Sequence, residues 1–168
     1  MRLNHLLRSL TFFGLLTSSS VGLSQTFQPT LPGTSVKDHS QSGSITVNGM
    51  LCPTLPGTTV RDYSKPCTKQ DGNESYQTLP GTSVRDYSQP GWVHDGNKSH
   101  QTLPGTSVRD YNAPSLVRDG EFIYQTLPGT SVRDYDAPGY IIDGDMMYPT
   151  LPGTKVRDYS KAGIKIED

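Results

Sequence analysis

Alanine is scarce in this chain of 168 residues, and its scarcity argues against a helical protein. It occurs only at Ala113, Ala137 and Ala162, whereas glycine and proline number 17 and 13. Alanine is the strongest helix former, while glycine and proline are typical of turns and interrupt helices. The composition therefore excludes a helical bundle and favours a chain of short strands and turns.

Large aliphatic and aromatic side chains are also few. Leu, Ile, Val and Phe make up only 25 of the 144 residues from position 25 onward, about 17%. This fraction lies where disorder competes with folding, although the small net charge of −1 does not enforce disorder. Partial disorder therefore stays open beside a folded all-β chain.

The N-terminal 24 residues have the layout of a secretory signal peptide. Arg2, His5 and Arg8 precede an apolar run over residues 10–16, and small residues at Gly22 and Ser24 favour cleavage before Gln25. The apolar run is much shorter than the ~20 residues that span a bilayer. We therefore expect a secreted, periplasmic or otherwise extracytoplasmic protein, with no membrane span in the mature chain.

Neither sign of charge dominates the mature chain. Without Arg2 and Arg8 it keeps 13 basic and 16 acidic side chains, for a net charge of −3 with histidine neutral. No basic patch is present, so nucleic acid is not an expected partner.

Catalytic motifs are missing from the sequence. No GxSxG, HExxH, Walker loop or CxxC pattern occurs, and the four histidines have no regular spacing to the cysteines. A tandem repeat also suits an active site poorly, because unlike residues must converge there once. The sequence predicts a protein that is not an enzyme, with no catalytic residue, cofactor or metal site assigned.

The dominant feature is a 24-residue repeat. The motif TLPG recurs at residues 30, 54, 78, 102, 126 and 150, and these six threonines open units one to six. We divide the chain into a signal peptide (1–24), a short leader (25–29) and six tandem units (30–168), the last truncated. This periodicity predicts an all-β tandem-repeat array of short strands and hairpins. Positions within a unit are numbered below from its threonine.

Three turns are expected in each unit. Leu-Pro-Gly-Thr at positions 2–5 is typical of a type II turn, and a second turn falls at positions 13–14. Asp-Gly at positions 18–19 favours a type I′ hairpin loop, at Asp71-Gly72, Asp95-Gly96, Asp119-Gly120 and Asp143-Gly144. Asp at position 9 is expected to begin a turn by accepting backbone N–H groups. Because unit two is polar on both hairpin arms, we expect order to increase toward the C-terminus.

A single unit has few apolar anchors. We expect Leu at position 2, Val at position 7 and Tyr at positions 10 and 23 to be buried. These groups cannot offset the entropy lost in ordering 24 residues, so contacts between units must stabilise the chain.

Two cysteines, Cys52 and Cys67, suit an oxidising compartment. We predict a disulfide between them, with two free thiols as the alternative.

An Arg-Asp-Tyr sequence recurs at positions 8–10 of five units, and unit one carries Lys-Asp-His instead. Two interpretations are open: a periodic binding row, or a structural ladder that sets the spacing of the units. The candidate row is Arg61, Tyr63, Arg85, Tyr87, Arg109, Tyr111, Arg133, Tyr135, Arg157 and Tyr159.

We therefore expect an exported, non-enzymatic repeat protein with a structural, adhesive or multivalent binding role. Its expected partner is a surface polymer or a protein. The alternative is a small-ligand or calcium-binding module built on the Asp-Gly turns. Asn73 and Asn97 also head N-glycosylation triplets.

Overall fold

The computed structural model describes residues 25–167, which form twelve short strands and no helix. The all-β prediction is confirmed for this part of the chain, while the predicted signal peptide lies outside the described residues. Accordingly, residues 25–167 contain no helix long and apolar enough to cross a membrane. The strands are β1 (Thr26–Pro29), β2 (Ser44–Val47), β3 (Met50–Pro53), β4 (Thr68–Asp71), β5 (Glu74–Gln77), β6 (Trp92–Asp95), β7 (Lys98–Gln101), β8 (Ser115–Asp119), β9 (Phe122–Gln125), β10 (Tyr140–Asp143), β11 (Met146–Pro149) and β12 (Ile164–Glu167).

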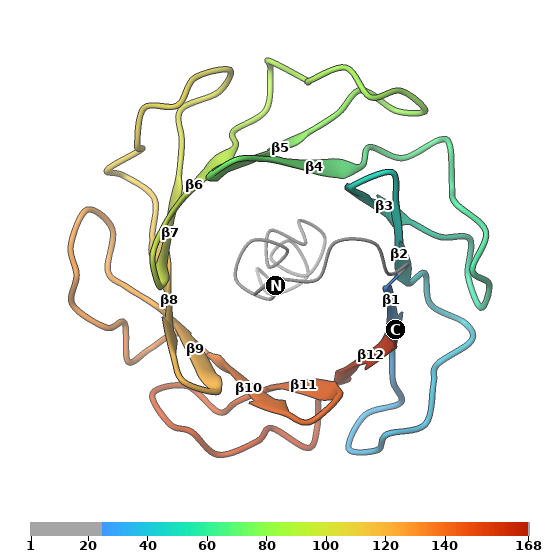
Figure 1. The fold of residues 1–168 in the computed structure, drawn as a ribbon. Helices are drawn as coiled ribbons and strands as arrows, with labels where there is room; N and C mark the ends of the chain where they lie inside the picture. The colour runs from blue at the N-terminus through green and yellow to red at the C-terminus, as the bar shows by residue number, and fades with distance from the viewer. Residues whose placement is uncertain (1–24, 168) are drawn as a thin grey trace.

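The strands close into one antiparallel barrel. Each strand pairs with its neighbours in chain order, and β1 pairs with β12 to complete the ring. Figure 1 shows the strands as a ring with the long connecting loops projecting outward from it. Those loops carry the repeated motif TLPGTSVRDY, so the most uniform part of the sequence lies on the outside.

The hairpin loops lie one residue later than the sequence predicts. In unit two Asp71 pairs with Glu74, so the loop is Gly72-Asn73, and Gly72 has a φ of +59°. The Asp-Gly type I′ prediction is therefore wrong in units two to five. A Gly-Xaa loop needs a left-handed residue only at its first position, which is the type II′ pattern, and the aspartate stays in the strand. The shift matters because moving the register by one residue exchanges the two faces of a strand.

Unit one uses a different hairpin loop. Asn48 and Gly49 have φ angles of +50° and +73°, as a type I′ turn requires. Its flanking residues Val47 and Met50 form the closing pair, so the register agrees with that of the other units. Polar unit two also forms a complete hairpin, since β4 and β5 pair over four residues.

The ring is closed by a hairpin whose two strands come from opposite ends of the described chain. β1 and β12 pair over four residues, like the two strands within each other hairpin, whereas β1 and β2 pair over only two. Residues 150–168 and 25–29 together supply the 24 positions of one unit. The segment separated as a leader thus contains the strand that unit six lacks, a role that the sequence does not reveal.

The threonine that opens each unit is a buried link between consecutive segments. Its N–H donates to the carbonyl of a residue at position 14, and its Oγ1 accepts the N–H of that same residue, as in Thr54 with Gly43. Thr30 makes the same two bonds with Gly163, across the closure of the ring. All six threonines are buried, namely Thr30, Thr54, Thr78, Thr102, Thr126 and Thr150.

The main apolar cluster lies on the inner face of the strands, at positions 15 and 22. It comprises Phe27, Leu51, Trp92, Leu116, Ile123, Tyr140, Met147 and Ile164. In β5 and β7 position 22 is instead a buried serine, Ser75 or Ser99. His94 lies between these two serines, with its Nε2 2.9 Å from Ser75 Oγ and its Nδ1 2.7 Å from Ser99 Oγ. Burial lowers the pKa of His94. The inner face therefore consists of a longer apolar part, formed by the cluster, and a shorter polar part, formed by His94 and the two serines.

The disulfide Cys52–Cys67 is confirmed, and the structure explains its place in the repeat. Cys52 occupies position 23 of one unit and Cys67 position 14 of the next. Three other places pair tyrosine with glycine there, and the place beside the closure pairs Gln28 with Gly43. A Cβ on Gly163 would lie 2.7 Å from the ring of Tyr148, so the aromatic residue requires glycine there. In units three and four the same place holds His100 and Ser115, hydrogen-bonded at 2.8 Å. Position 14 is therefore glycine wherever position 23 is tyrosine.

This pairing can be tested with a double variant. Gly163→Ser alone is expected to destabilise the protein by about 1–3 kcal/mol because the new side chain meets the Tyr148 ring. Adding Tyr148→His recreates the His100–Ser115 arrangement and should recover part of that loss. Urea unfolding of the two single variants and the double variant measures the coupling, and strictly additive losses would contradict the pairing.

Candidate functional site: the outer loops

Each outer loop is a compact structure held by its own hydrogen bonds. In unit two the N–H of Leu55 donates to Val60 O, and the N–H of Thr58 donates to Leu55 O. Gly57 between them has a φ of +66°, which fits the predicted type II turn. The segment after this turn is not a strand, because only Thr54 and Arg61 form an isolated bridge across the base of the loop.

Aspartate at position 9 begins the next turn, as predicted. In unit two Asp62 Oδ1 accepts the N–H of Ser64 at 3.0 Å and its hydroxyl at 2.6 Å. These hydrogen bonds, with that from the hydroxyl the larger cause, hold the pKa of Asp62 below its usual value. The same arrangement lowers the pKa of Asp38, Asp86 and Asp158. These aspartates are therefore committed to the local fold.

The loops expose the residues that the sequence predicts to be anchors. Leu at position 2 is 42–44% exposed, Val at position 7 is 57–59% exposed and Tyr at position 10 is 64–66% exposed. The prediction that these three positions are buried is wrong, because each loop turns outward and the core lies on the inner face of the strands. Within residues 25–167, every exposed large hydrophobic residue belongs to these loops. Together these residues form what we call the outer band: positions 2, 7 and 10 of the units.

The arginines of the candidate row lie between neighbouring units. In all five units with Arg-Asp-Tyr, the guanidinium lies over the tyrosine two residues later, with 4.6–5.4 Å between Cζ and the ring centroid. Arg85 also lies over Tyr76 of the preceding unit, and Arg157 lies over Tyr148. Arg133 likewise lies over Phe122 and Tyr124. These contacts place each arginine against its own loop, and three of them against the preceding hairpin.

Three arginines also reach forward to the following unit. Arg85, Arg133 and Arg157 each donate to the carbonyl of the threonine at position 5 of the next loop, at 3.2–3.4 Å. For Arg157 that next loop belongs to unit one, so the contacts continue across the closure. The arginines thus have the contacts of a structural ladder, whereas the tyrosines of the row remain open to solvent.

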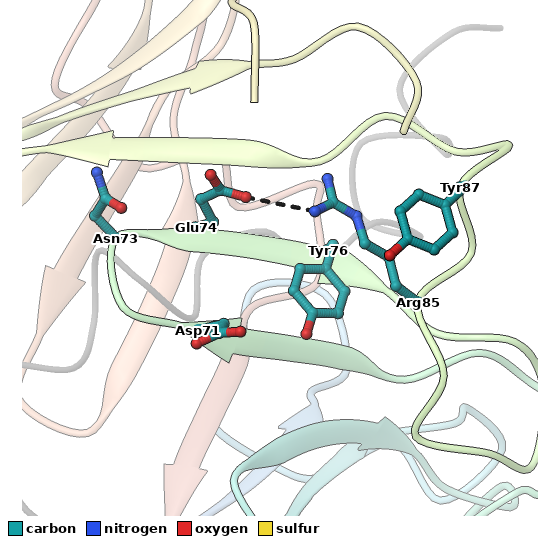
Figure 2. A pocket seen from close by; sticks show the side chains of 6 residues that line it. All are labelled: Asp71, Asn73, Glu74, Tyr76, Arg85 and Tyr87. Carbon is teal, nitrogen blue, oxygen red and sulfur yellow. Dashed lines mark hydrogen bonds and ion pairs between the residues drawn. The ribbon is translucent and has the colours of Figure 1, made fainter. Parts of the chain in front are cut away.

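Grooves lie where consecutive loops meet the outer face of a hairpin. One groove of about 340 Å³ is formed by the unit-two hairpin and the unit-three loop, and Figure 2 shows its six lining side chains. They are Asp71, Asn73, Glu74, Tyr76, Arg85 and Tyr87. The equivalent groove beside the closure has about 390 Å³ and is lined by Gln28, Lys37, His39 and loop residues 57–60. The sequence does not identify these grooves, because their walls come from different units.

The remaining predicted sites concern metal binding, glycosylation and the disulfide. In the described residues, no group of three or more His, Cys, Asp or Glu side chains is arranged to hold a metal ion. Asn73 lies in the loop between β4 and β5, and Asn97 lies between β6 and β7. The disulfide is compatible with an extracytoplasmic location.

Comparison of the chain with protein-family models, curated proteins and solved structures gives no match.

Proposed function

We propose that this chain is an exported, non-enzymatic tandem-repeat protein that acts as a multivalent binding or adhesive module outside the cytoplasm. Its binding surface is the outer band, which presents leucine, valine and tyrosine outward around the ring. The partner is a surface polymer or a protein with several equivalent contact points. The disulfide supports the extracytoplasmic location, since such bonds persist in oxidising compartments.

One observation carries the proposal: two exposed apolar positions are invariant among the units, whereas a buried apolar position of the strands varies. Leu at position 2 and Val at position 7 are present in all six units, whereas position 22 is Leu, Ser, Ser, Ile, Met or Phe. Recent duplication alone would leave both sets equally similar. Exposed apolar side chains contribute little to folding, so their retention indicates contact with a partner.

Several weak contacts, one from each outer loop, can together hold a partner firmly when they form at the same time. A single loop offers a small apolar surface, but simultaneous engagement of several loops makes later contacts intramolecular. Such linkage raises apparent affinity by about 10²–10⁴ without any new kind of contact. The closed ring favours it, because loops on a rigid scaffold lose little entropy on binding.

The test replaces valine with lysine at position 7 in one, three or all six units of the full chain. Binding to immobilised peptidoglycan sacculi and to fibronectin is measured by biolayer interferometry. We expect three replacements to weaken apparent affinity by about 10–100-fold on the surface that binds, and six to abolish binding. Melting temperature should change little, because these side chains are exposed.

The matched control places lysine at position 6, which is Ser35, Ser83, Ser107 and Ser131 in four units, Thr59 in unit two and already Lys155 in unit six, so it matches the one-unit and three-unit series. This control adds the same charge beside the same turn and should leave binding nearly intact. Equal losses in the two series would assign the effect to charge. Absence of binding by the native chain to either surface would contradict the proposed partner class.

A further inference from the structure

The groove between units two and three contains a pair of like charges that no other described hairpin has. Asp71 and Glu74 are directly opposite each other in the register of β4 and β5. In unit three the same positions hold Asp95 and Lys98, which carry opposite charges. Elsewhere in the described hairpins, at least one member of this pair is uncharged.

Two carboxylates in directly opposite positions destabilise a hairpin. Arg85 offsets part of this cost, with its Nη1 3.5 Å from Glu74 Oε2. The same guanidinium also donates a hydrogen bond to Thr106 O and lies over the rings of Tyr76 and Tyr87. Among the described residues Asp71 has no ion pair. Such a local conflict, retained beside a groove, is characteristic of a functional site.

The groove combines hydrogen-bonding groups with an exposed aromatic ring. Figure 2 shows Asn73 and Glu74 toward the hairpin end, with Tyr76, Arg85 and Tyr87 at the other. Arg85 covers part of Tyr87, yet that tyrosine is 66% exposed, so most of its ring can accept a flat apolar surface. Asp71 and Glu74 supply acceptors, and Asn73 supplies both a donor and an acceptor.

We propose that this groove binds a neutral pyranose unit of an oligosaccharide. The hydroxyls of the sugar would donate to the carboxylates of Asp71 and Glu74, and its C–H face would lie on Tyr87. The volume of about 340 Å³ is at the lower end for small-molecule sites, which suits one or two sugar rings. Two carboxylates against one guanidinium disfavour anionic polymers. The inference rests on the proposed binding role and gives it a ligand class.

The test titrates the full chain with cellohexaose and chitohexaose by isothermal calorimetry, with a heparin hexasaccharide as the anionic comparison. We expect one neutral oligosaccharide to bind at one site per chain and heparin not to bind. Tyr87→Ala should weaken binding by about tenfold or more, which is the scale of one lost aromatic contact. The matched control, Tyr124→Ala, removes a ring of β9 that lies outside this groove and outside the outer band, and should have no effect.

A second variant separates a binding role from a structural one. Asp71→Asn removes the like-charge pair, so we expect the unliganded protein to melt about 1–3 °C higher while its affinity for the oligosaccharide falls. Asp95→Asn in unit three removes a carboxylate that is opposite Lys98 in the strand register, and should not raise the melting temperature. If Asp71 instead stabilises the fold, Asp71→Asn should lower the melting temperature.

Several results would overturn the inference. They are preferential binding of heparin, equal losses in Tyr87→Ala and Tyr124→Ala, no binding of either neutral sugar, or binding abolished by a calcium chelator. These results come from calorimetry with short soluble oligosaccharides. The proposed multivalent function is tested separately, by the binding of the outer-band variants to immobilised surfaces. Retention on a surface without oligosaccharide binding would therefore reject this inference alone, and loss of surface binding with sugar binding intact would reject the multivalent role alone.

Discussion

A chain that begins at Thr30 instead of Gln25 is expected to lose its cooperative unfolding transition. The missing residues contain β1, which pairs with β12 over four residues and places Phe27 in the inner-face cluster. Without β1 the ring cannot close, and both β2 and β12 lose a pairing partner. The loss of Phe27 alone is worth about 3–5 kcal/mol, a large fraction of the stability of a small domain. Thermal melting followed by circular dichroism compares chains 25–168 and 30–168.

A circular permutant provides the control for this deletion. Moving residues 25–29 behind residue 168 makes the sixth unit continuous, with residues 168 and 25 at the two loop positions. Asp168→Gly in this permutant provides the Gly-Xaa loop of units two to five. We expect the permutant to melt at or above the temperature of chain 25–168. A truncated chain that melts like the parent, or a permutant that fails to recover, would contradict closure through β1.

Replacing both cysteines with alanine is expected to lower the melting temperature by about 6–12 °C. The bond links residues 15 apart, and closing a loop of this size contributes about 3 kcal/mol in the chain-entropy model. For a protein of this length each kcal/mol corresponds to about 2–4 °C. The measurement is thermal melting of the double variant against the oxidised parent.

The repeat supplies a second double variant as a control. Cys52→Tyr with Cys67→Gly installs the tyrosine–glycine combination found between other units. Arg61, which already lies over Tyr63, then has a second ring to stack on, as Arg85 has in Tyr76. This variant should recover part of the stability that the alanine pair loses. If both double variants melt with the parent, the disulfide makes no contribution to stability.

Features determined by neighbouring residues were predicted correctly. The Leu-Pro-Gly-Thr turn, the aspartate that caps the next turn and the disulfide all follow from chemistry within a short stretch of chain. The hairpin register was missed because Asp-Gly and Gly-Xaa are both acceptable loops, and one residue separates them. Only the pairing of Asp71 with Glu74 decides between them.

Features determined by distant residues were not predictable in the same way. The exposure of Leu55 and Val60 depends on which side of the ring the loop takes, and a pattern of apolar residues does not contain that information. The groove beside Arg85 likewise takes its walls from two units, so no single copy of the repeat shows it. The copies compared with one another carry more information: Thr at position 1 is invariant and buried in all six units, and position 14 is glycine wherever position 23 is tyrosine.

The pairing of β1 with β12, which closes the ring, must form last when the chain folds during synthesis. The strands that meet there, β1 and β12, are the first and last of the described elements, and Phe27 pairs with Ile166. During synthesis the first strand emerges at once but finds its hairpin partner only after every other unit has been made. Contacts between residues so far apart in sequence form late and slow folding. The growing chain is therefore an open curved sheet with a free edge at each end, and the two edges disappear together in the final step.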